Sequence, residues 1–251
     1  MLMKSAKGAA KWLARRSLAN SLLLPLRPAV RKAEAFVGFT AWSHKHLKNQ
    51  KCWRPEGVSG YDHGRRKLLY QRVLESERLA GEELTYLEFG VFQGESIKWW
   101  LERNSNPDSR FHGFDTFEGL PERWEDKAAG TFSTFGQCPH VADPRCKFIQ
   151  GMFQATLTEF LNQMRRNKRL IVHLDADLYT STIYVLLNLS SYLRSGDILI
   201  FDEFNSVDNE FRAFEDFVAV TGARYRVIGF VNDCEQVAMC LDLAKSEGSI
   251  S

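Results

Sequence analysis

Six acidic residues follow short apolar runs of the sequence, at the points where we expect strands to end. They are Glu88, Asp115, Asp175, Asp177, Asp202 and Glu203. One acid after a strand often only caps the helix that follows. Six acids at one edge of a sheet would repel one another unless a cation or a ligand offset their charge. We therefore interpret these residues as members of a functional site.

The last four of these acids have the residue type and the spacing of a metal site. Asp175 and Asp177 follow one apolar run, and Asp202 and Glu203 follow the next. Neighbouring parallel strands would bring the two segments together, and Mg²⁺ prefers several carboxylate oxygens as ligands. The alternative role, capping of a helix from Ser181, needs only one acid. We expect Asp175, Asp202 and Glu203 to supply the metal ligands.

A loop with two glycines follows the first apolar run. Gly90 permits a tight turn, and Gly94 lets a ligand approach the backbone closely. The next helix would offer free N–H groups to a carboxylate, with the Ser96 hydroxyl as a further donor. Glu88 suits an ammonium group, and Asp115 stands where an acid can bind both hydroxyls of a ribose. The loop is neither Gly-x-Gly-x-x-Gly nor a Walker loop, which argues against a dinucleotide.

Strand and helix patterns alternate through most of the chain. We expect strands over residues 84–90, 111–115, 147–150, 170–174, 197–201, 225–231 and 236–242. We expect helices over residues 70–79, 95–103, 155–167, 181–193 and 210–221. This alternation indicates right-handed crossovers and a parallel sheet. The predicted fold class is α/β: a Rossmann-like, doubly wound, mostly parallel seven-stranded sheet with an antiparallel closing strand and an N-terminal helical extension.

Charge divides the chain into a basic arm and an acidic body. The first 33 residues hold eight of the 33 Lys and Arg residues and none of the 31 acids, which leaves a net charge of −6 on residues 34–251. An acidic body argues against a nucleic-acid binder. Residues 1–16 have the pattern of a basic amphipathic helix. A solvated arm, or one packed on a partner subunit, is favoured over contact with an anionic membrane surface, because basic runs often form only tails.

The domain boundaries follow from composition. We expect residues 1–59 to form the basic arm and a cover, with an aromatic and irregular stretch over 36–60, and residues 60–251 to form the core domain. Residues 121–146 show no period and are predicted to be an insertion near the substrate. No apolar run is long enough to span a bilayer, and five cysteines without a Cys-x-x-Cys pair suggest reduced thiols. We expect a cytoplasmic protein, peripheral to the membrane if the arm docks there.

Five sequence segments, in the order in which they occur, resemble the motifs of a known family. They are Glu88-Phe89-Gly90 to Gly94, Gly113 to Pro121, Gly151-Met152-Phe153, His173 to Thr182 and Phe201-Asp202-Glu203-Phe204. Together they are similar to the class I S-adenosylmethionine methyltransferases of the macrocin O-methyltransferase kind, which modify sugar hydroxyls of antibiotics. The resemblance covers roughly residues 60–242. It departs from the family at Ala176, where glycine is common, and at Glu203, where aspartate is common.

The resemblance implies roles for the residues that carry it. Glu88 and the Gly90–Gly94 loop would face the methionine part of S-adenosylmethionine, Asp115 its ribose, and Gly151, Met152 and Phe153 its adenine. Asp175 would border the cofactor and also bind Mg²⁺ or another divalent cation with Asp202 and Glu203. Asp177 would be the general base that accepts the proton of the acceptor hydroxyl.

The leading hypothesis is therefore a metal-assisted O-methyltransferase for a sugar, a glycan or a glycosylated natural product. One alternative is a glycosyltransferase, because an Asp-x-Asp motif after a strand also binds a metal and a nucleotide sugar. Another is a non-catalytic assembly protein on the same fold. The sequence does not identify the acceptor, and a homo-oligomer is left open. We interpret His173 as a buried core histidine, whereas Tyr179 could either line the pocket or pack at a helix start.

Overall fold

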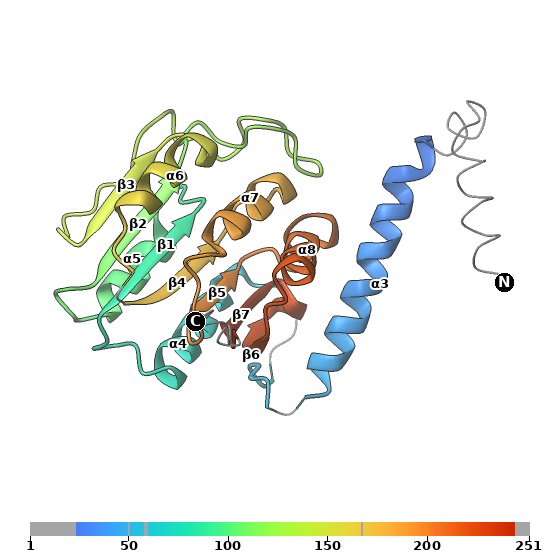
Figure 1. Cartoon of the computed structure of the whole chain (residues 1–251), viewed down its shortest axis with the longest axis horizontal. Coiled ribbons are helices and arrows are strands. Elements are labelled where there is room, and N and C mark those ends of the chain that lie inside the picture. Colours follow the sequence, from blue (N-terminus) through green and yellow to red (C-terminus); the bar gives the residue numbers. More distant parts are fainter. Residues whose placement is uncertain (1–23, 50, 58–59, 167, 244–251) are drawn as a thin grey trace, which may run out of the picture.

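A seven-stranded sheet forms the centre of the molecule, with helices on both of its faces (Figure 1). The computed structural model describes residues 24–49, 51–57, 60–166 and 168–243. The strand order is β3-β2-β1-β4-β5-β7-β6, and β7 pairs antiparallel with both of its neighbours while the other pairs are parallel. A long N-terminal helix lies beside this core. The predicted fold class is thus confirmed.

The elements have the following bounds. The strands are β1 Leu84–Phe89, β2 Arg110–Asp115, β3 Cys146–Gln150, β4 Arg169–Leu174, β5 Ile198–Phe201, β6 Tyr225–Val231 and β7 Gln236–Leu241. The helices are α3 Arg27–Leu47, α4 Arg66–Ser76, α5 Glu95–Arg103, α6 Phe153–Gln163, α7 Tyr179–Leu189 and α8 Arg212–Thr221. Four short helical turns are η1 Leu24–Leu26, η2 His63–Arg65, η3 Val207–Phe211 and η4 Asn232–Cys234, of which η3 is π-helical.

Two apolar layers bury the faces of the sheet. Successive side chains of a strand point to opposite faces, so Tyr86 joins the layer under α4 and α5 while Leu87 joins the layer under α6, α7 and α8. All four residues of β5 are apolar and buried, and β4 is buried from Leu170 to Leu174 on both of its faces, as in a sheet that helices cover on both sides. The sheet is therefore a rigid support for the loops at its edges.

The register of the sheet aligns the strand ends that carry the acids. Phe89 of β1 pairs with Phe114 of β2 and with Leu174 of β4, and Leu174 pairs with Phe201 of β5. These four strands therefore end at the same level. The residues that directly follow the paired ones lie along one edge of the sheet: Gly90, Asp115, Asp175 and Asp202.

The long helix α3 corrects one prediction. Residues 36–47, expected to be irregular, are helical and continue a helix that begins at Arg27 with a proline in its first turn. Trp42 lies seven residues after Ala35, which places both on one face of this helix, and both are buried. The predicted helix over residues 1–16 lies outside the described residues. The division into residues 1–59 and 60–251 stays a prediction.

Other boundaries differ by a few residues from those predicted. The helix predicted over 210–221 begins with the π-helical turn η3 and ends at Gly222, which has a left-handed backbone. The helices α4, α6 and α7 begin two to four residues earlier than predicted. Within the described ranges, no helix is both long and apolar enough to cross a membrane.

A hydrogen bond joins α3 to the sheet. The Trp42 ring packs 4.8 Å from the Phe204 ring, and its Nε1 donates to the Tyr225 hydroxyl at 3.0 Å. Replacing Tyr225 with phenylalanine removes this acceptor and keeps the ring. We expect the free energy of unfolding to fall by about 1 kcal/mol, measured by urea denaturation. An unchanged free energy of unfolding would show that the bond does not stabilise the contact.

Candidate functional site

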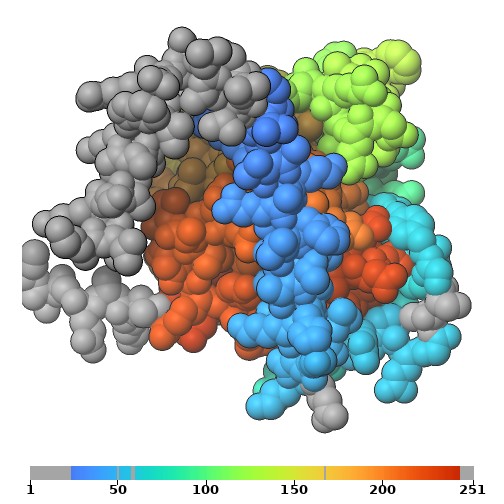
Figure 2. Space-filling view, turned by 90° about the vertical axis from the view of Figure 1, so that its right-hand side faces the viewer, coloured from blue at the N-terminus to red at the C-terminus, as the bar shows by residue number. Residues whose placement is uncertain are grey.

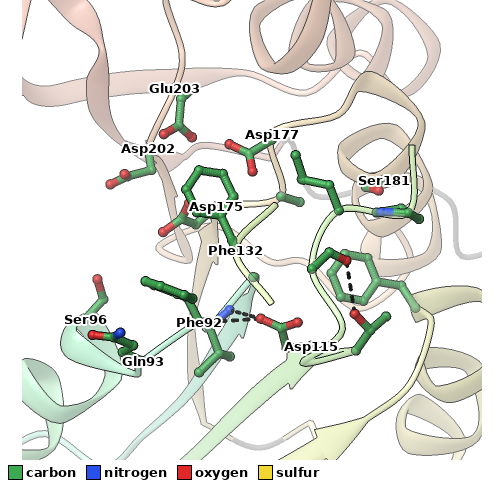
Figure 3. A pocket seen from close by; sticks show the side chains of 18 of the residues that line it. Phe92, Gln93, Ser96, Asp115, Phe132, Asp175, Asp177, Ser181, Asp202 and Glu203 are labelled. Carbon is green, nitrogen blue, oxygen red and sulfur yellow. Dashed lines mark hydrogen bonds between the residues drawn. The ribbon is translucent and has the colours of Figure 1, made fainter. Parts of the chain in front are cut away.

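A cavity of about 400 Å³ opens at the edge of the sheet where the acids align (Figure 3). Its lining comes from the loops after β1, β2, β4 and β5 and from the first turns of α4, α5 and α6. This volume is in the range of small-molecule sites. Figure 3 shows Asp175, Asp177, Asp202 and Glu203 at one end of the view and Asp115 at the other.

The loop after β1 has a backbone that requires glycine. A Cβ atom on Gly90 would lie 1.7 Å from the carbonyl oxygen of Asp175, and Gly90 has a φ of +90°. Gly94 is left-handed, with a φ of +73°, at the N-cap of α5. These two glycines bring the loop and the first turn of α5 close to the acidic segment after β4. Gly90 lines the cavity, and Gly94 lies just behind its wall.

Asp115 organises this loop. Its Oδ2 accepts hydrogen bonds from the backbone N–H groups of Val91 at 2.7 Å and Phe92 at 2.9 Å, and its Oδ1 accepts one from Phe117 at 2.8 Å. Asp115 also lines the cavity. A carboxylate with two oxygens still has lone pairs available for a ligand. Asp115 can therefore hold the loop and contact a bound molecule at the same time.

Glu88 lies behind the cavity wall. Its side chain is fully buried, accepts a 2.7 Å hydrogen bond from the Tyr86 hydroxyl and lies 3.6 Å from Nδ1 of His173. It is not among the residues that line the cavity. Of the other predicted cofactor residues, Ser96 lines the cavity and its hydroxyl lies 3.2 Å from that of Tyr70.

The segment predicted to lie near adenine follows β3. Met152 and Phe153 line the cavity, while Gly151 has a φ of +139° and supports the turn before α6. The backbone N–H of Gly151 donates to the carbonyl oxygen of Asp115 at 2.9 Å. The predicted ribose and adenine residues are therefore adjacent in space.

Four carboxylates converge at the other end of the cavity. Among the described residues, two groups have potential ligand atoms within 4.8 Å of one another: His173, Asp175 and Asp202 form one, and Asp175, Asp177 and Glu203 form the other. The predicted metal set of Asp175, Asp202 and Glu203 spans both groups, which share Asp175. Asp177 has a φ of +59°, a backbone conformation that aspartate tolerates better than most residues.

Two cations hold one of these carboxylates as an anion. Nη1 of Arg66 lies 3.5 Å from Asp202 and 3.9 Å from Asp175, and Nε2 of His173 lies 3.8 Å from Asp202. Burial would raise the pKa of Asp202, but His173 and Arg66 outweigh burial and lower it. Asp202 is thus the fixed negative charge of the cluster.

The remaining acids of the cluster are harder to ionise. Burial and then the charge of Asp202 raise the pKa of Asp177 to about 7, and the same two causes raise the pKa values of Asp175 and Glu203 well above their usual range. Like charges crowded in a buried place resist ionisation until a cation offsets them. Perturbed carboxyl groups of this kind are typical of functional sites.

The donor set fits a hard divalent cation. Both carboxylate oxygens of Asp202 and Oε2 of Glu203 are buried and have no hydrogen-bond partner in the described part of the chain. Buried polar atoms without hydrogen-bond partners are rare in folded proteins, and such atoms are suited to bind an ion, a water molecule or a ligand. Carboxylate oxygens are the ligands that Mg²⁺ prefers. Asp175, Asp202 and Glu203 are therefore suited to hold such an ion.

Sequence reasoning missed two charged residues of this region. Arg66 stands in the first turn of α4, ahead of the residue where the helix was expected to begin. Glu210 lies in η3, is fully buried and accepts the backbone N–H of Glu203 at 3.0 Å, while its Oε1 has no partner among the described residues. A signal for Glu210 was present, because an acid stands between phenylalanines on an otherwise apolar helix face.

Two expectations about single side chains are resolved by their contacts. His173 is fully buried between the hydroxyls of Tyr70 and Tyr86, at 3.3 and 2.9 Å, as expected of a core histidine. Burial lowers its pKa, but the nearby acids Asp202 and Glu88 raise it to about 10. Tyr179 packs at its helix start instead of lining the cavity, since its hydroxyl donates to Asp216 at 2.9 Å.

The insertion after β2 covers the acidic end of the cavity. Leu120 and Trp124 form a small buried cluster with Leu178, the residue after Asp177. The Thr180 hydroxyl donates to Glu122 at 2.9 Å, which ties the insertion to α7. Residues 121–145 contain no helix or strand, apart from a single bridge between Trp124 and Lys127, and β3 begins at Cys146. That residues 121–146 are an insertion near the substrate stays a prediction.

Comparisons with known proteins identify relatives of the fold. Residues 125–228 match the family model of the macrocin O-methyltransferases (TylF). The crystal structure of CalS11, a calicheamicin methyltransferase, has a TM-score of 0.54 and 24% identity and covers 73% of this chain and 79% of that one. No curated protein sequence matches the chain.

Two further structures show the same architecture. The apo structure of CalS11, described as a TDP-rhamnose 3'-O-methyltransferase of calicheamicin biosynthesis, has a TM-score of 0.51 and 23% identity and covers 74% of this chain and 82% of that one. The O-methyltransferase NovP has a TM-score of 0.51 and 19% identity and covers 71% of this chain and 78% of that one. The predicted resemblance is therefore confirmed: the chain has the fold of these methyltransferases and is related, through residues 125–228, to the macrocin O-methyltransferases.

Proposed function

We propose that this protein is an S-adenosylmethionine-dependent, divalent-metal-assisted O-methyltransferase that acts on a hydroxyl of a sugar, a glycan or a glycosylated natural product. One observation carries this proposal. The glycine loop with Asp115 and the carboxylate cluster with Asp177 open into one cavity of about 400 Å³. A donor site and an acidic acceptor site in one cavity are what a transfer between two bound molecules requires.

The donor end has groups for each part of the cofactor. The first turn of α5 and the Ser96 hydroxyl can donate hydrogen bonds to a carboxylate. Asp115 can accept hydrogen bonds from ribose hydroxyls, and Met152 and Phe153 offer apolar surface to an adenine. When bound, S-adenosylmethionine supplies an electrophilic methyl group on a sulfonium. The acidic lining of the cavity favours that positive charge.

The acceptor end has groups for activating a hydroxyl. Asp177 accepts the proton of the acceptor hydroxyl as general base. Asp175, Asp202 and Glu203 would hold a divalent cation, which would supply a charge that lowers the pKa of the acceptor hydroxyl. Arg66 and His173 keep Asp202 ionised, and Glu210 fixes the backbone of Glu203. The cluster of Leu120, Trp124 and Leu178 shields this end of the cavity from water.

The comparisons support the choice of acceptor class. The matched family is named for a macrocin O-methyltransferase, and CalS11 is described as a sugar-nucleotide O-methyltransferase. A glycosyltransferase would not need the glycine loop and Asp115 beside the acidic cluster. The test is transfer of a labelled methyl group from S-adenosylmethionine to a panel of sugars and glycosides, with and without Mg²⁺. Transfer of a glycosyl group from a nucleotide sugar instead would contradict the proposal.

Replacing Asp115 with alanine should weaken the binding of S-adenosylhomocysteine by roughly tenfold or more. The variant loses both the ribose contact and the three backbone hydrogen bonds that shape the loop, and a single charged hydrogen bond contributes about 1.5–3 kcal/mol. Isothermal titration calorimetry measures the affinity. The control is Asp126→Asn, because the Asp126 side chain is 90% exposed on the insertion. Equal affinity of Asp115→Ala and the parent would remove Asp115 from the donor site.

We also propose that methyl transfer needs only the part of the chain after the basic arm. Ala35 is the first buried residue of the described chain, and all residues from 24 to 34 are exposed. Removing residues 1–33 should therefore leave transfer to a soluble acceptor unchanged, as steady-state kinetics would show. Loss of turnover in a truncated protein that remains folded would contradict this division.

A further inference from the structure

The N-terminal half of α3 projects from the domain. Every residue from Leu24 to Glu34 is exposed, whereas the half from Ala35 onward contains the buried residues Ala35, Trp42 and His46. Figure 1 shows α3 at the side of the sheet beyond α8, and Figure 2 shows it running along the face that is turned to the viewer. Most of the stability of a helix in water comes from packing an apolar face. The projecting half therefore lacks what usually stabilises a helix.

An apolar surface lies on the side of α3 that faces away from the domain. Leu26, Val30 and Val37 are spaced four and seven residues apart, which places them on one face of the helix. Their exposed fractions are 54%, 61% and 67%. Ala35 follows Val30 by five residues, a rotation of about 140°, so the packed face lies nearly opposite. We call Leu26, Val30 and Val37 the outer stripe.

Further apolar and basic groups surround the outer stripe. Leu24 and Phe36 are 59% and 60% exposed and extend the apolar surface. Arg27 and Arg31 are exposed in the same half of the helix, whose one acid is Glu34, whereas Nζ of Lys32 lies 3.6 Å from Oδ2 of Asp208 in η3. In the sequence, residues 1–23 add five more basic side chains and no acid.

We propose that the outer stripe and the cations around it bind the surface of an anionic lipid bilayer. An amphipathic helix can lie in the interface with its apolar face in the acyl region and its cations near the headgroups. Each cation near such a surface contributes about 1 kcal/mol. The proposal is independent of the proposed methyl transfer, because the projecting half of α3 contributes no residue to the cavity.

The charge of this region favours a bilayer over a second copy of the chain. In a symmetric contact, the same surface of both copies would meet. Two outer stripes packed together would bring Arg27 and Arg31 of one copy near those of the other, and these cations would repel one another. An anionic bilayer attracts the same cations. Pairing of two copies through α3 is therefore the outcome that the test must distinguish.

The test is flotation of the full-length protein with vesicles of phosphatidylcholine, with and without phosphatidylglycerol. We expect binding only to the anionic vesicles, and binding that weakens as salt is raised. The double variant Val30→Asp/Val37→Asp should bind about tenfold less, since it loses two buried apolar groups and adds two repelled charges. Arg27→Glu/Arg31→Glu should lose binding by at least a similar factor.

The control is Leu68→Asp, which places one new negative charge at a 46% exposed apolar residue of α4. It should bind the vesicles nearly as the parent does. Equal binding of the Val30→Asp/Val37→Asp variant and the parent would overturn the proposal, as would equal binding to neutral and anionic vesicles. A dimer seen by analytical ultracentrifugation that dissociates in the same variant, without vesicle binding by the parent, would also overturn it.

Discussion

Replacing Asp177 with asparagine lowers kcat for methyl transfer by about 10²–10⁴-fold and leaves the affinity for S-adenosylhomocysteine unchanged. The proposed role of Asp177 is to accept the proton of the acceptor hydroxyl, and an amide cannot do so at neutral pH. Asparagine has nearly the same shape and also tolerates the left-handed backbone that Asp177 has at a φ of +59°. The variant should therefore fold as the parent does.

Steady-state kinetics and calorimetry together make this prediction specific. A general base affects the chemical step, so kcat should fall while cofactor binding stays the same. Asp126→Asn, the same change at an exposed acid of the insertion, is the control and should keep full activity. A kcat close to that of the parent in Asp177→Asn would assign proton acceptance to another group. A loss of cofactor affinity would instead place Asp177 at the donor end.

Replacing Asp175 or Asp202 with alanine should lower the affinity for Mg²⁺. The loss should exceed the 10–100-fold loss expected for a residue that only positions a metal ligand. Both residues belong to the ligand groups within 4.8 Å, and a carboxylate that binds the ion directly is hard to replace by water alone. Titration calorimetry of Mg²⁺ into the parent and the variants measures the loss. Removal of metal with a chelator should abolish methyl transfer by the parent, and Mg²⁺ should restore it.

The Glu203→Ala variant tests whether Glu203 binds the cation. If the cation binds among Asp175, Asp177 and Glu203, then Glu203→Ala should lose Mg²⁺ affinity as strongly as Asp175→Ala does. If Glu203 is a methylene too long to reach the ion, Glu203→Ala should bind Mg²⁺ as the parent does. Parent-like affinity in both Asp175→Ala and Asp202→Ala would show that the cluster is not a metal site.

The edge of the sheet could be predicted from the sequence because its geometry follows from topology. Once strands and helices alternate, the carboxyl ends of parallel strands must meet at one edge. That reasoning alone brings Asp115, Asp175 and Asp202 together, and the cavity contains all three. Ser96, Met152 and Phe153 also line the cavity, since each stands in or next to the first turn of a helix at this edge. Ser96 was proposed from the glycine loop before its helix, whereas Met152 and Phe153 were proposed from the family resemblance alone.

The residues that were missed depend on tertiary contacts. Arg66 precedes the apolar period of α4, and the residue before it, Arg65, makes no side-chain cap, so the local sequence gives no start signal for α4. Its role comes from ion pairs with Asp175 and Asp202, which are more than 100 residues away in the chain. The position of Glu210 depends on the π-helical turn η3, a form that periodicity does not predict.

The prediction for Glu88 shows a limit of arguing from strand ends. Glu88 lies one residue before the end of β1, and the pleat directs its side chain to the layer under α4 and α5 with Tyr86 and His173. The misreading of residues 36–47 as irregular has a different cause. The proline in the first turn of α3 is a start signal, but the aromatic residues after it obscured the helical spacing.

Calorimetric titration of S-adenosylhomocysteine into the full-length protein tests the central claim most directly. The account predicts binding at one site per chain, weakened in Asp115→Ala and unchanged in Asp177→Asn. It also predicts no transfer of a glycosyl group from a UDP-sugar in the presence of Mg²⁺. Binding of a UDP-sugar without binding of S-adenosylhomocysteine would contradict the account and would favour a glycosyltransferase.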